Sequence, residues 1–287
     1  MSKKSKGQLF WNRTGWVDIG GYGKPPVGLD FKFEVKKYGN IYSKFSVGIL
    51  GLNSSNINAM TVYNPVDAVN QGREISVFAG YEADGVPAMI CKGTVMNAMP
   101  TPPPEMWMNF ECMPFLKNKI PIDDVEPMYN KPISEVAKKI CDMMGFKYFW
   151  RSLNVKESTK INFNFTGCRD TALTKLADGL NLVVILGDNN DVYFYDKKAW
   201  NTIPIPRPID IPIINIESGL LMVGNVDAAG AKIRVRLNDT YSLFSWIKLE
   251  SKRIPKASGY YFVLSKTHKG HLRGEEWYTE LELRRKG

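Results

Sequence analysis

Apolar and polar residues alternate in both outer parts of the chain, as they do in half-buried strands. Residues 30–36 place Phe31, Phe33 and Val35 on one face of an extended segment. Residues 231–237 alternate in the same way and place their basic residues on the opposite face. Further strands are predicted at 41–50, 74–81, 87–95 and 106–113, and then at 214–223, 245–249, 260–264 and 277–283. Short strands repeated at this spacing predict a barrel or a sandwich in each outer part.

Local signals between these strands predict turns and loops. Ala83, Asp84 and Gly85 predict a hairpin, and the polar run 53–58 predicts a loop. The glycine-rich residues 20–24 predict a flexible N-terminal arm, because they lack the spacing of a phosphate-binding loop and the Ser or Thr that follows its lysine.

The middle of the chain follows a helical period instead. In residues 132–145 the apolar positions fall on one helix face, and Gly145 is a typical helix stop. A second helix is predicted at 170–180, a strand at 146–150, and a hairpin from 181–186 and 191–195. We therefore predict a mainly β protein with an α+β insert, divided into residues 1–116, 117–200 and 201–287.

Composition is that of an ordinary globular protein, with 44% hydrophobic and 23% charged residues. The four cysteines are far apart and form no CxxC pair, so we expect reduced, mostly buried thiols. No apolar run is long enough to span a bilayer or to act as a secretory leader. We expect the chain to fold in a cytoplasm, with no membrane anchor.

The excess of basic residues is local. Residues 1–13 and 231–256 carry net charges of +4 and +5, which together equal the whole net charge of +9. Lys232, Arg234 and Arg236 form the basic face of one predicted strand, which is suited to an acidic partner. A solvated surface would have the same composition.

Groups able to carry chemistry are sparse. His268 and His271 are the only histidines, and their glycine-rich surroundings predict a solvated turn rather than a metal site. The acidic run 123–126 is bounded by prolines and predicts a solvated loop. No cysteine has a base placed beside it by the predicted elements. We predict no catalytic, cofactor-binding or metal-binding residue, and thus no enzyme.

The last third carries a series of short motifs. They are Leu221-Met222-Val223-Gly224 before the strand 232–237, an aliphatic strand at 246–249, and Gly259-Tyr260-Tyr261-Phe262-Val263-Leu264 running into 266–270. A glycine-containing turn then leads to the aromatic-x-Thr-x-Leu strand that begins at Trp277. In this order, and with the β, α+β, β layout of the whole chain, the sequence resembles the baseplate hub family of contractile-tailed phages, also called late-control or phage protein D-like.

The resemblance implies two tube-like β-barrel domains that flank the α+β module. It further implies a homotrimer whose pseudo-sixfold ring joins the tail tube to the central spike, with baseplate wedge proteins as further partners. The chain would be made in the host cytoplasm and end in the virion, and DNA is a candidate for the lumen. The chain ends directly after the second predicted barrel, so a separate spike protein is expected. Interface residues are predicted at Lys232, Arg234, Arg236, Trp246 and Trp277.

Two other functions fit parts of the sequence. One is a nucleic-acid-binding β-barrel that uses the basic strand 232–236, with Trp246 and Tyr260 as stacking platforms. The other is a tail protein that binds or degrades the cell wall, for which only the middle module gives any support. Tryptophans 11, 16 and 107 are further candidates for subunit interfaces, although ordinary cores use tryptophan as well.

Overall fold

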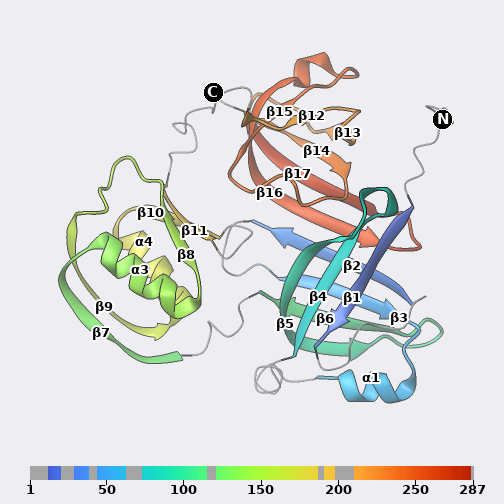
Figure 1. The fold of residues 1–287 in the computed structure, drawn as a ribbon, viewed down its shortest axis with the longest axis horizontal. Helices are drawn as coiled ribbons and strands as arrows, with labels where there is room; N and C mark the ends of the chain where they lie inside the picture. The colour runs from blue at the N-terminus through green and yellow to red at the C-terminus, as the bar shows by residue number, and fades with distance from the viewer. Residues whose placement is uncertain are drawn as a thin grey trace.

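The computed structural model describes residues 12–20, 29–38, 44–62, 73–114, 121–186, 191–197 and 210–285, without the side chains of 121–126 and of Asp170. Figure 1 shows two groups of strands beside each other and a separate module that contains α3 and α4. The first group holds β1 (Arg13–Ile19), β2 (Asp30–Lys37), β3 (Phe45–Leu50), β4 (Glu74–Tyr81), β5 (Ala88–Pro100) and β6 (Trp107–Met113). The second holds β12 (Ile213–Ile214), β13 (Leu220–Gly224), β14 (Gly230–Arg236), β15 (Trp246–Leu249), β16 (Gly259–His271) and β17 (Trp277–Arg285). The prediction of a mainly β fold with an α+β insert is confirmed.

The two groups repeat one topology. In the first, the strands pair in the order β1-β4-β5-β6-β3-β2, and in the second in the order β12-β15-β16-β17-β14-β13. Each strand of one group thus corresponds to the strand at the same place in the other, both along the chain and across the sheet. All the matched pairings are antiparallel except that of the two-residue β12, which is parallel to β15. We call the two groups the N-terminal and C-terminal half-sheets.

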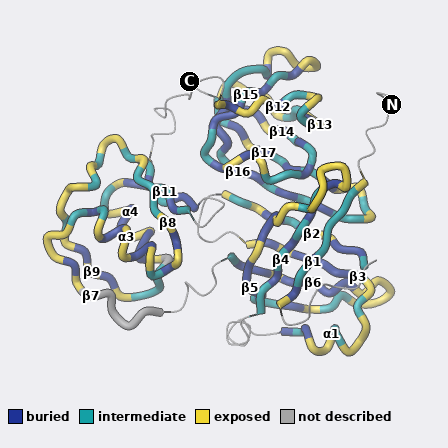
Figure 2. The backbone as a smooth tube through the Cα atoms, viewed as in Figure 1, coloured by how far each residue is buried: buried dark blue, intermediate teal, exposed yellow. Residues whose placement is uncertain are grey.

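The half-sheets are joined into one sheet of 12 strands, because β2 pairs with the second part of β16. Among the described residues, no pairing links β1 to β2 or closes either half-sheet on itself. Buried and partly exposed residues alternate along strands such as β4, and Figure 2 shows buried stretches throughout both half-sheets. The predicted alternation of faces is therefore real, while the pairing between the halves was not predicted.

The α+β module combines two small sheets with two helices. β7 (Pro121–Pro132) pairs with β9 (Lys160–Cys168), and β10 (Leu182–Leu186), β11 (Asp191–Asp196) and β8 (Lys147–Trp150) form the other sheet. Helix α3 (Ile133–Met144) buries the predicted apolar face, and Gly145 ends it in the left-handed conformation at φ 72°. Helix α4 (Arg169–Gly179) buries Leu173, Leu176 and Ala177 in the same core.

Several local predictions were wrong. The predicted strand 214–223 is instead two strands, β12 and β13, with a turn at 216–219 between them. The run 53–58 belongs to a helix, α1 (Ser54–Met60), because the Asn53 side chain caps its first turn and the helix buries Ile57 and Met60. The acidic run 123–126 has the backbone of a strand, because β7 pairs with β9 there. β16 runs on to His271 instead of ending near 264, because β2 supplies backbone partners as far as that residue.

The cores follow the three parts of the chain, with one exception. The core of the N-terminal half-sheet also contains Leu237 and Trp277 from the last part. The module and the C-terminal half-sheet each have a core of their own. Among the described residues, no helix combines the length and the apolar character needed to cross a bilayer.

Candidate functional site: the seam between the half-sheets

The pairing of β2 with β16 forms a seam across which both half-sheets are hydrogen-bonded. The register runs from Lys266 opposite Lys37 to His271 opposite Lys32. β16 is long enough for this because it spans 13 residues and uses its first part to pair with β15. The seam therefore brings together side chains that lie more than two hundred positions apart in the sequence.

A buried polar cluster lies at one end of the seam. Lys266 is 1% exposed and His268 is not exposed at all. Oδ1 of Asp239 accepts a hydrogen bond from Nζ of Lys266 at 2.6 Å and lies 3.1 Å from Nε2 of His268. Lys37, on β2, donates to the same carboxylate at 3.3 Å. The carboxylate of Asp239 thus neutralises one lysine from each half-sheet, Lys266 on β16 and Lys37 on β2.

Further contacts hold the ammonium group of Lys266 and the Nδ1 side of the His268 ring. Nζ of Lys266 also donates to the carbonyl of Tyr241 at 3.2 Å. Nδ1 of His268 lies 2.9 Å from Oγ1 of Thr279, and that hydroxyl donates to the carbonyl of Asn238. An ammonium group in such a position is tolerated only where partners of this kind replace its water.

Burial and charge set the ionisation of the two titrating groups. Burial lowers the pKa of His268 to about 4, although the contact with Asp239 opposes this shift. Burial alone would raise the pKa of Asp239, but His268, Lys266 and Lys37 outweigh it and hold that pKa well below its usual range. Near neutral pH the imidazole is thus neutral and the carboxylate charged.

A second set of contacts ties the half-sheets together at the Tyr81 end of β4. The hydroxyl of Tyr81 accepts from the backbone N–H of Leu237 at 3.1 Å and donates to the carbonyl of Trp277 at 3.4 Å. The indole N–H of Trp277 donates to the carbonyl of Gly80 at 3.2 Å. Arg13 lies over the Trp277 ring, 5.6 Å from its centroid. These contacts explain why Trp277 belongs to the core of the N-terminal half-sheet.

The three predicted basic interface residues all have acidic partners within the chain. Glu280, on the neighbouring strand β17, lies 2.8 Å from Lys232 and 3.2 Å from Arg234. Arg236 pairs with Asp84 across the two half-sheets and covers the ring of Tyr81. Their role in a subunit interface remains a prediction, and their intramolecular pairing reduces the charge that they offer to an acidic partner.

The two predicted interface tryptophans are interior residues of the single chain. Trp246 and Trp277 are each 4% exposed. Trp246 packs against Phe262 with ring centroids 5.4 Å apart. Both indole rings are thus covered within the single chain, and their role in a subunit interface remains a prediction.

The prediction that the two histidines lie in a solvated turn was wrong. Both lie on β16, His268 buried in the cluster and His271 with Nε2 2.9 Å from Oδ2 of Asp30. The glycines that suggested a turn instead allow close packing, since a Cβ at Gly270 would overlap the Phe33 ring. Among the described residues, no group of three His, Cys, Asp or Glu side chains is arranged to hold a metal ion.

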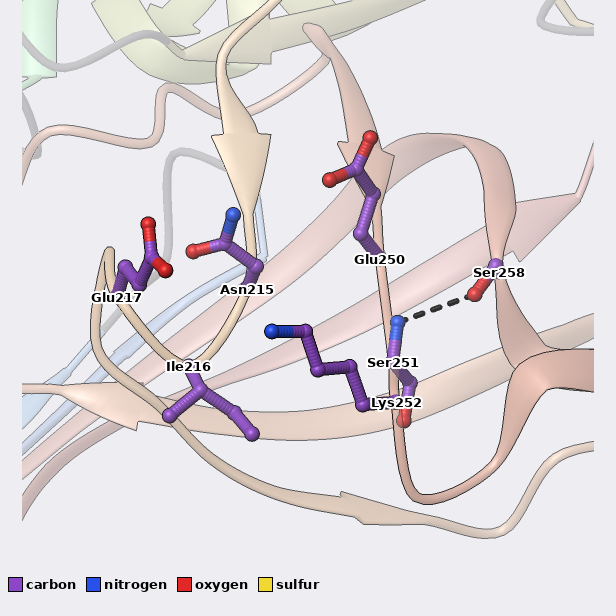
Figure 3. A pocket seen from close by; sticks show the side chains of 7 residues that line it. All are labelled: Asn215, Ile216, Glu217, Glu250, Ser251, Lys252 and Ser258. Carbon is purple, nitrogen blue, oxygen red and sulfur yellow. Dashed lines mark hydrogen bonds between the residues drawn. The ribbon is translucent and has the colours of Figure 1, made fainter.

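An open groove of about 260 Å³ lies on the C-terminal half-sheet, between the β12–β13 turn and the β15–β16 connection (Figure 3). Its lining consists of Asn215, Ile216, Glu217, Glu250, Ser251, Lys252 and Ser258. Glu250 pairs with Lys248 at 2.7 Å, and the Ser258 hydroxyl accepts from the backbone of Ser251. The lining contains neither His nor Cys, and the hydroxyls of Ser258 and Ser251 accept hydrogen bonds from the backbone N–H groups of Ser251 and Ile254.

Cys91, Cys112 and Cys141 are free and buried, as predicted, while Cys168 is partly exposed. Burial raises the pKa of the Cys141 thiol to about 12, and the pKa values of Cys91 and Cys112 are raised for the same reason. Such thiols are protonated at neutral pH and therefore poor nucleophiles.

The residues that build the seam were largely missed in the sequence. Asp239 lies between two predicted strands, and Tyr81 ends a strand without any unusual neighbour. Three signals were available in the sequence: His268, which was interpreted as part of a turn; Trp277, which was predicted at a subunit interface; and Lys266, a lysine just beyond an apolar run whose strand partner the sequence does not give.

Comparison with solved structures places this fold among tail proteins. A tail protein from Neisseria meningitidis MC58 aligns with a TM-score of 0.62 at 10% identity, covering 96% of this chain and 98% of that one. The 43 kDa tail protein of prophage MuSo2 from Shewanella oneidensis gives 0.62 at 10% identity, with 95% and 98% covered. The E. coli c3393 protein, a type VI secretion component, gives 0.58 at 10% identity, with 93% and 76% covered.

Sequence comparison identifies the family. No curated protein matches the chain. The profile of the family described as baseplate hub gp41, however, matches residues 27–283. This range is nearly the whole chain and contains the module, the seam and the strands of both half-sheets apart from β1 and the last two residues of β17. The chain therefore belongs to the baseplate hub gp41 family of structural phage tail proteins.

Proposed function

We propose that three copies of this chain form a ring that joins the tail tube to the central spike of a baseplate. The observation that carries the proposal is the repeated six-strand topology, which gives every chain two equivalent half-sheets. Three such chains place six half-sheets around an axis, which matches a sixfold tube on one face and a threefold spike on the other. The division at residues 116 and 200 is part of this proposal, with one tube-like domain on each side of the α+β module.

Open sheet ends support a ring. β1 and β13 are the terminal strands of the sheet path, and each has one described strand partner. Unpaired strand edges lead to uncontrolled pairing unless they are covered. Head-to-tail contacts that close into a ring cover such edges in every copy and leave none over.

A relative supports the choice of partners. The E. coli c3393 protein is a component of the type VI secretion system with structural similarity to the T4 tail proteins gp27 and gp5. By that similarity in fold, we place this chain between a tube protein and a spike protein, with wedge proteins outside the ring and DNA as a candidate for the lumen. The role is structural rather than catalytic.

Oligomer mass tests the proposal directly. Sedimentation velocity over a range of concentrations is expected to show a species with three times the chain mass of 32.5 kDa. Mixing it with the tube and spike proteins of the same tail is expected to give a complex that co-sediments. A protein that stays monomeric at the highest concentration and binds neither partner would overturn the proposal.

A further inference from the structure

We propose that the connection between β15 and β16 is a docking tip that binds an acidic segment of a threefold partner of the ring. We call residues 250–258 the basic tip, because they contain Lys252, Arg253 and Lys256. Figure 1 shows this connection at the end of the C-terminal half-sheet that points away from the N-terminal half-sheet. The inference names one contact surface of the proposed function, and it rests on the ring for the symmetry of the partner.

The three cations of the tip are not neutralised within the part of the chain that the structure describes. The other basic residues of the segment 231–256 each have a carboxylate of the same chain within ion-pair distance: Lys232, Arg234, Arg236 and Lys248. Among the described residues, Lys252, Arg253 and Lys256 have no such partner, and all three are exposed. Their positive charge is therefore available to an acidic partner outside the chain.

Hydrogen bonds fix the backbone of the basic tip. The Ser251 hydroxyl accepts from the backbone N–H of Ile254 at 3.1 Å, and the Ser258 hydroxyl accepts from that of Ser251 at 3.0 Å. Ala257 is fully buried, and the Tyr261 hydroxyl donates to its carbonyl at 2.7 Å. The cations therefore project from an ordered loop, so a partner that binds them has little backbone entropy to remove.

Exposed apolar side chains lie beside the cations. Ile254 on the tip is 40% exposed, and Ile216 on the β12–β13 turn is 47% exposed. Ile216 and Lys252 both line the groove described above, and Figure 3 shows the Lys252 side chain extending across it. Apolar side chains flanked by charged ones are typical of the surfaces that bind other proteins.

The same groove argues against a nucleic acid as the partner. Glu217 and Glu250 line it together with Lys252, so a chain of phosphates would meet two carboxylates. Trp246, which could have stacked on a base, is buried. An acidic protein segment can instead place single carboxylates on the cations and an apolar side chain against Ile216. The chemistry of the surface therefore favours a protein.

The equivalent connection of the N-terminal half-sheet has the opposite charge. The repeat makes the β4–β5 connection equivalent to the basic tip, and each contains a short 3₁₀ helix, Glu82–Asp84 and Pro255–Ala257. The β4–β5 connection has two acidic residues and no basic one, and Asp84 pairs with Arg236 of the same chain. A ring of three copies would therefore carry three basic tips rather than six. A partner that engages every tip equally is threefold, as the proposed spike is and the tube is not.

Charge reversal tests the basic tip. The tip variant carries Lys252→Glu, Arg253→Glu and Lys256→Glu, and biolayer interferometry measures its affinity for the spike protein of the same tail. We expect the affinity to fall by at least about tenfold, which corresponds to about 1.4 kcal/mol. Binding of the unchanged chain is expected to weaken as salt is added, because salt screens exposed ion pairs. The tip variant should lose most of this salt dependence.

A matched control has the same change in net charge. Lys138→Glu, Lys156→Glu and Lys160→Glu reverse three exposed lysines of the α+β module. This control is expected to change the affinity by less than about twofold, because charges far from the contact are screened. A second control, Lys252→Arg with Lys256→Arg, keeps the charge of the tip and is expected to bind like the unchanged chain. Circular dichroism and the urea midpoint show whether each variant is folded.

The outcomes separate this inference from the proposed function. If the chain is trimeric and the tip variant binds the spike protein as tightly as the unchanged chain, or if the trimer does not bind it at all, the inference is overturned and the ring stands. A folded tip variant that is monomeric would assign the tip to a second copy instead. Loss of DNA retardation with unchanged spike binding would assign it to a nucleic acid. A monomeric chain that binds no spike protein overturns both proposals.

Discussion

Replacing Asp239 with asparagine is the sharpest test of the seam. The change keeps the size of the side chain and an acceptor oxygen, but removes the charge that neutralises Lys266 and Lys37. Lys266 is 1% exposed, so water cannot take over the role of the carboxylate. The variant therefore leaves the buried ammonium group of Lys266 without the carboxylate that neutralises it, next to neutral acceptors such as the Tyr241 carbonyl.

The expected loss of stability is large. Removing one partner of a buried ion pair typically costs about 3–5 kcal/mol. Asparagine retains a neutral acceptor, so we expect about 3 kcal/mol, against a typical total stability of about 5–15 kcal/mol. With a urea dependence of about 3 kcal/mol per molar, this moves the unfolding midpoint down by about 1 M.

The assay combines a global and a local measurement. Urea unfolding, followed by tryptophan fluorescence at fixed protein concentration, gives the free energy of unfolding. Amide hydrogen exchange on β2 and β16 then locates the loss, because these strands meet at the seam. Glu135→Gln, which breaks the exposed ion pair with Lys131, is the control and is expected to change stability by less than about 0.5 kcal/mol.

A rescue variant makes the reasoning refutable. In Asp239→Asn with Lys266→Met the buried charge is absent, and stability is expected to recover most of the loss, since apolar replacement of a buried pair is often neutral. The reasoning is refuted if Asp239→Asn costs less than about 1 kcal/mol, or if the added Lys266→Met does not restore stability.

Three further predictions concern other contacts. Because the pKa of His268 is lowered to about 4, His268 binds a proton between pH 6.5 and 4 in the unfolded chain but stays neutral in the folded chain, so the free energy of unfolding falls by about 3 kcal/mol as the pH drops through this window. Thermal unfolding at a series of pH values should show a shallower fall for His268→Gln, and equal slopes for the two proteins would contradict the assignment. Tyr81→Phe leaves the buried N–H of Leu237 without its acceptor and should cost about 1–3 kcal/mol in urea unfolding; an unchanged midpoint would show that this contact contributes nothing. Asn53→Ala removes the cap of α1 and should cost about 1 kcal/mol, with faster amide exchange confined to that helix; exchange that rises equally throughout the sheet would count against a local role.

The sequence predicted well wherever a single element decides its own structure. Helix α3 begins and ends where its apolar period and Gly145 indicate. Most strands lie where alternation placed them, because alternation reports which side chains face a core. The failures came where a partner decides: α1 is too short for a clear period, and β7 and the second part of β16 became strands through pairing.

The sequence by itself determined the mainly β character, the α+β insert, the reduced cysteines and, through its motifs, the family. Only the tertiary structure decided that the two outer parts repeat one topology and share one sheet, and that Lys266 and His268 are buried rather than solvated. The physical reason is that the alternation of apolar and polar residues in a strand sets which residues face inward but does not specify which other strand pairs with it. A lysine can be buried only because that neighbour, with Asp239, replaces the water it loses.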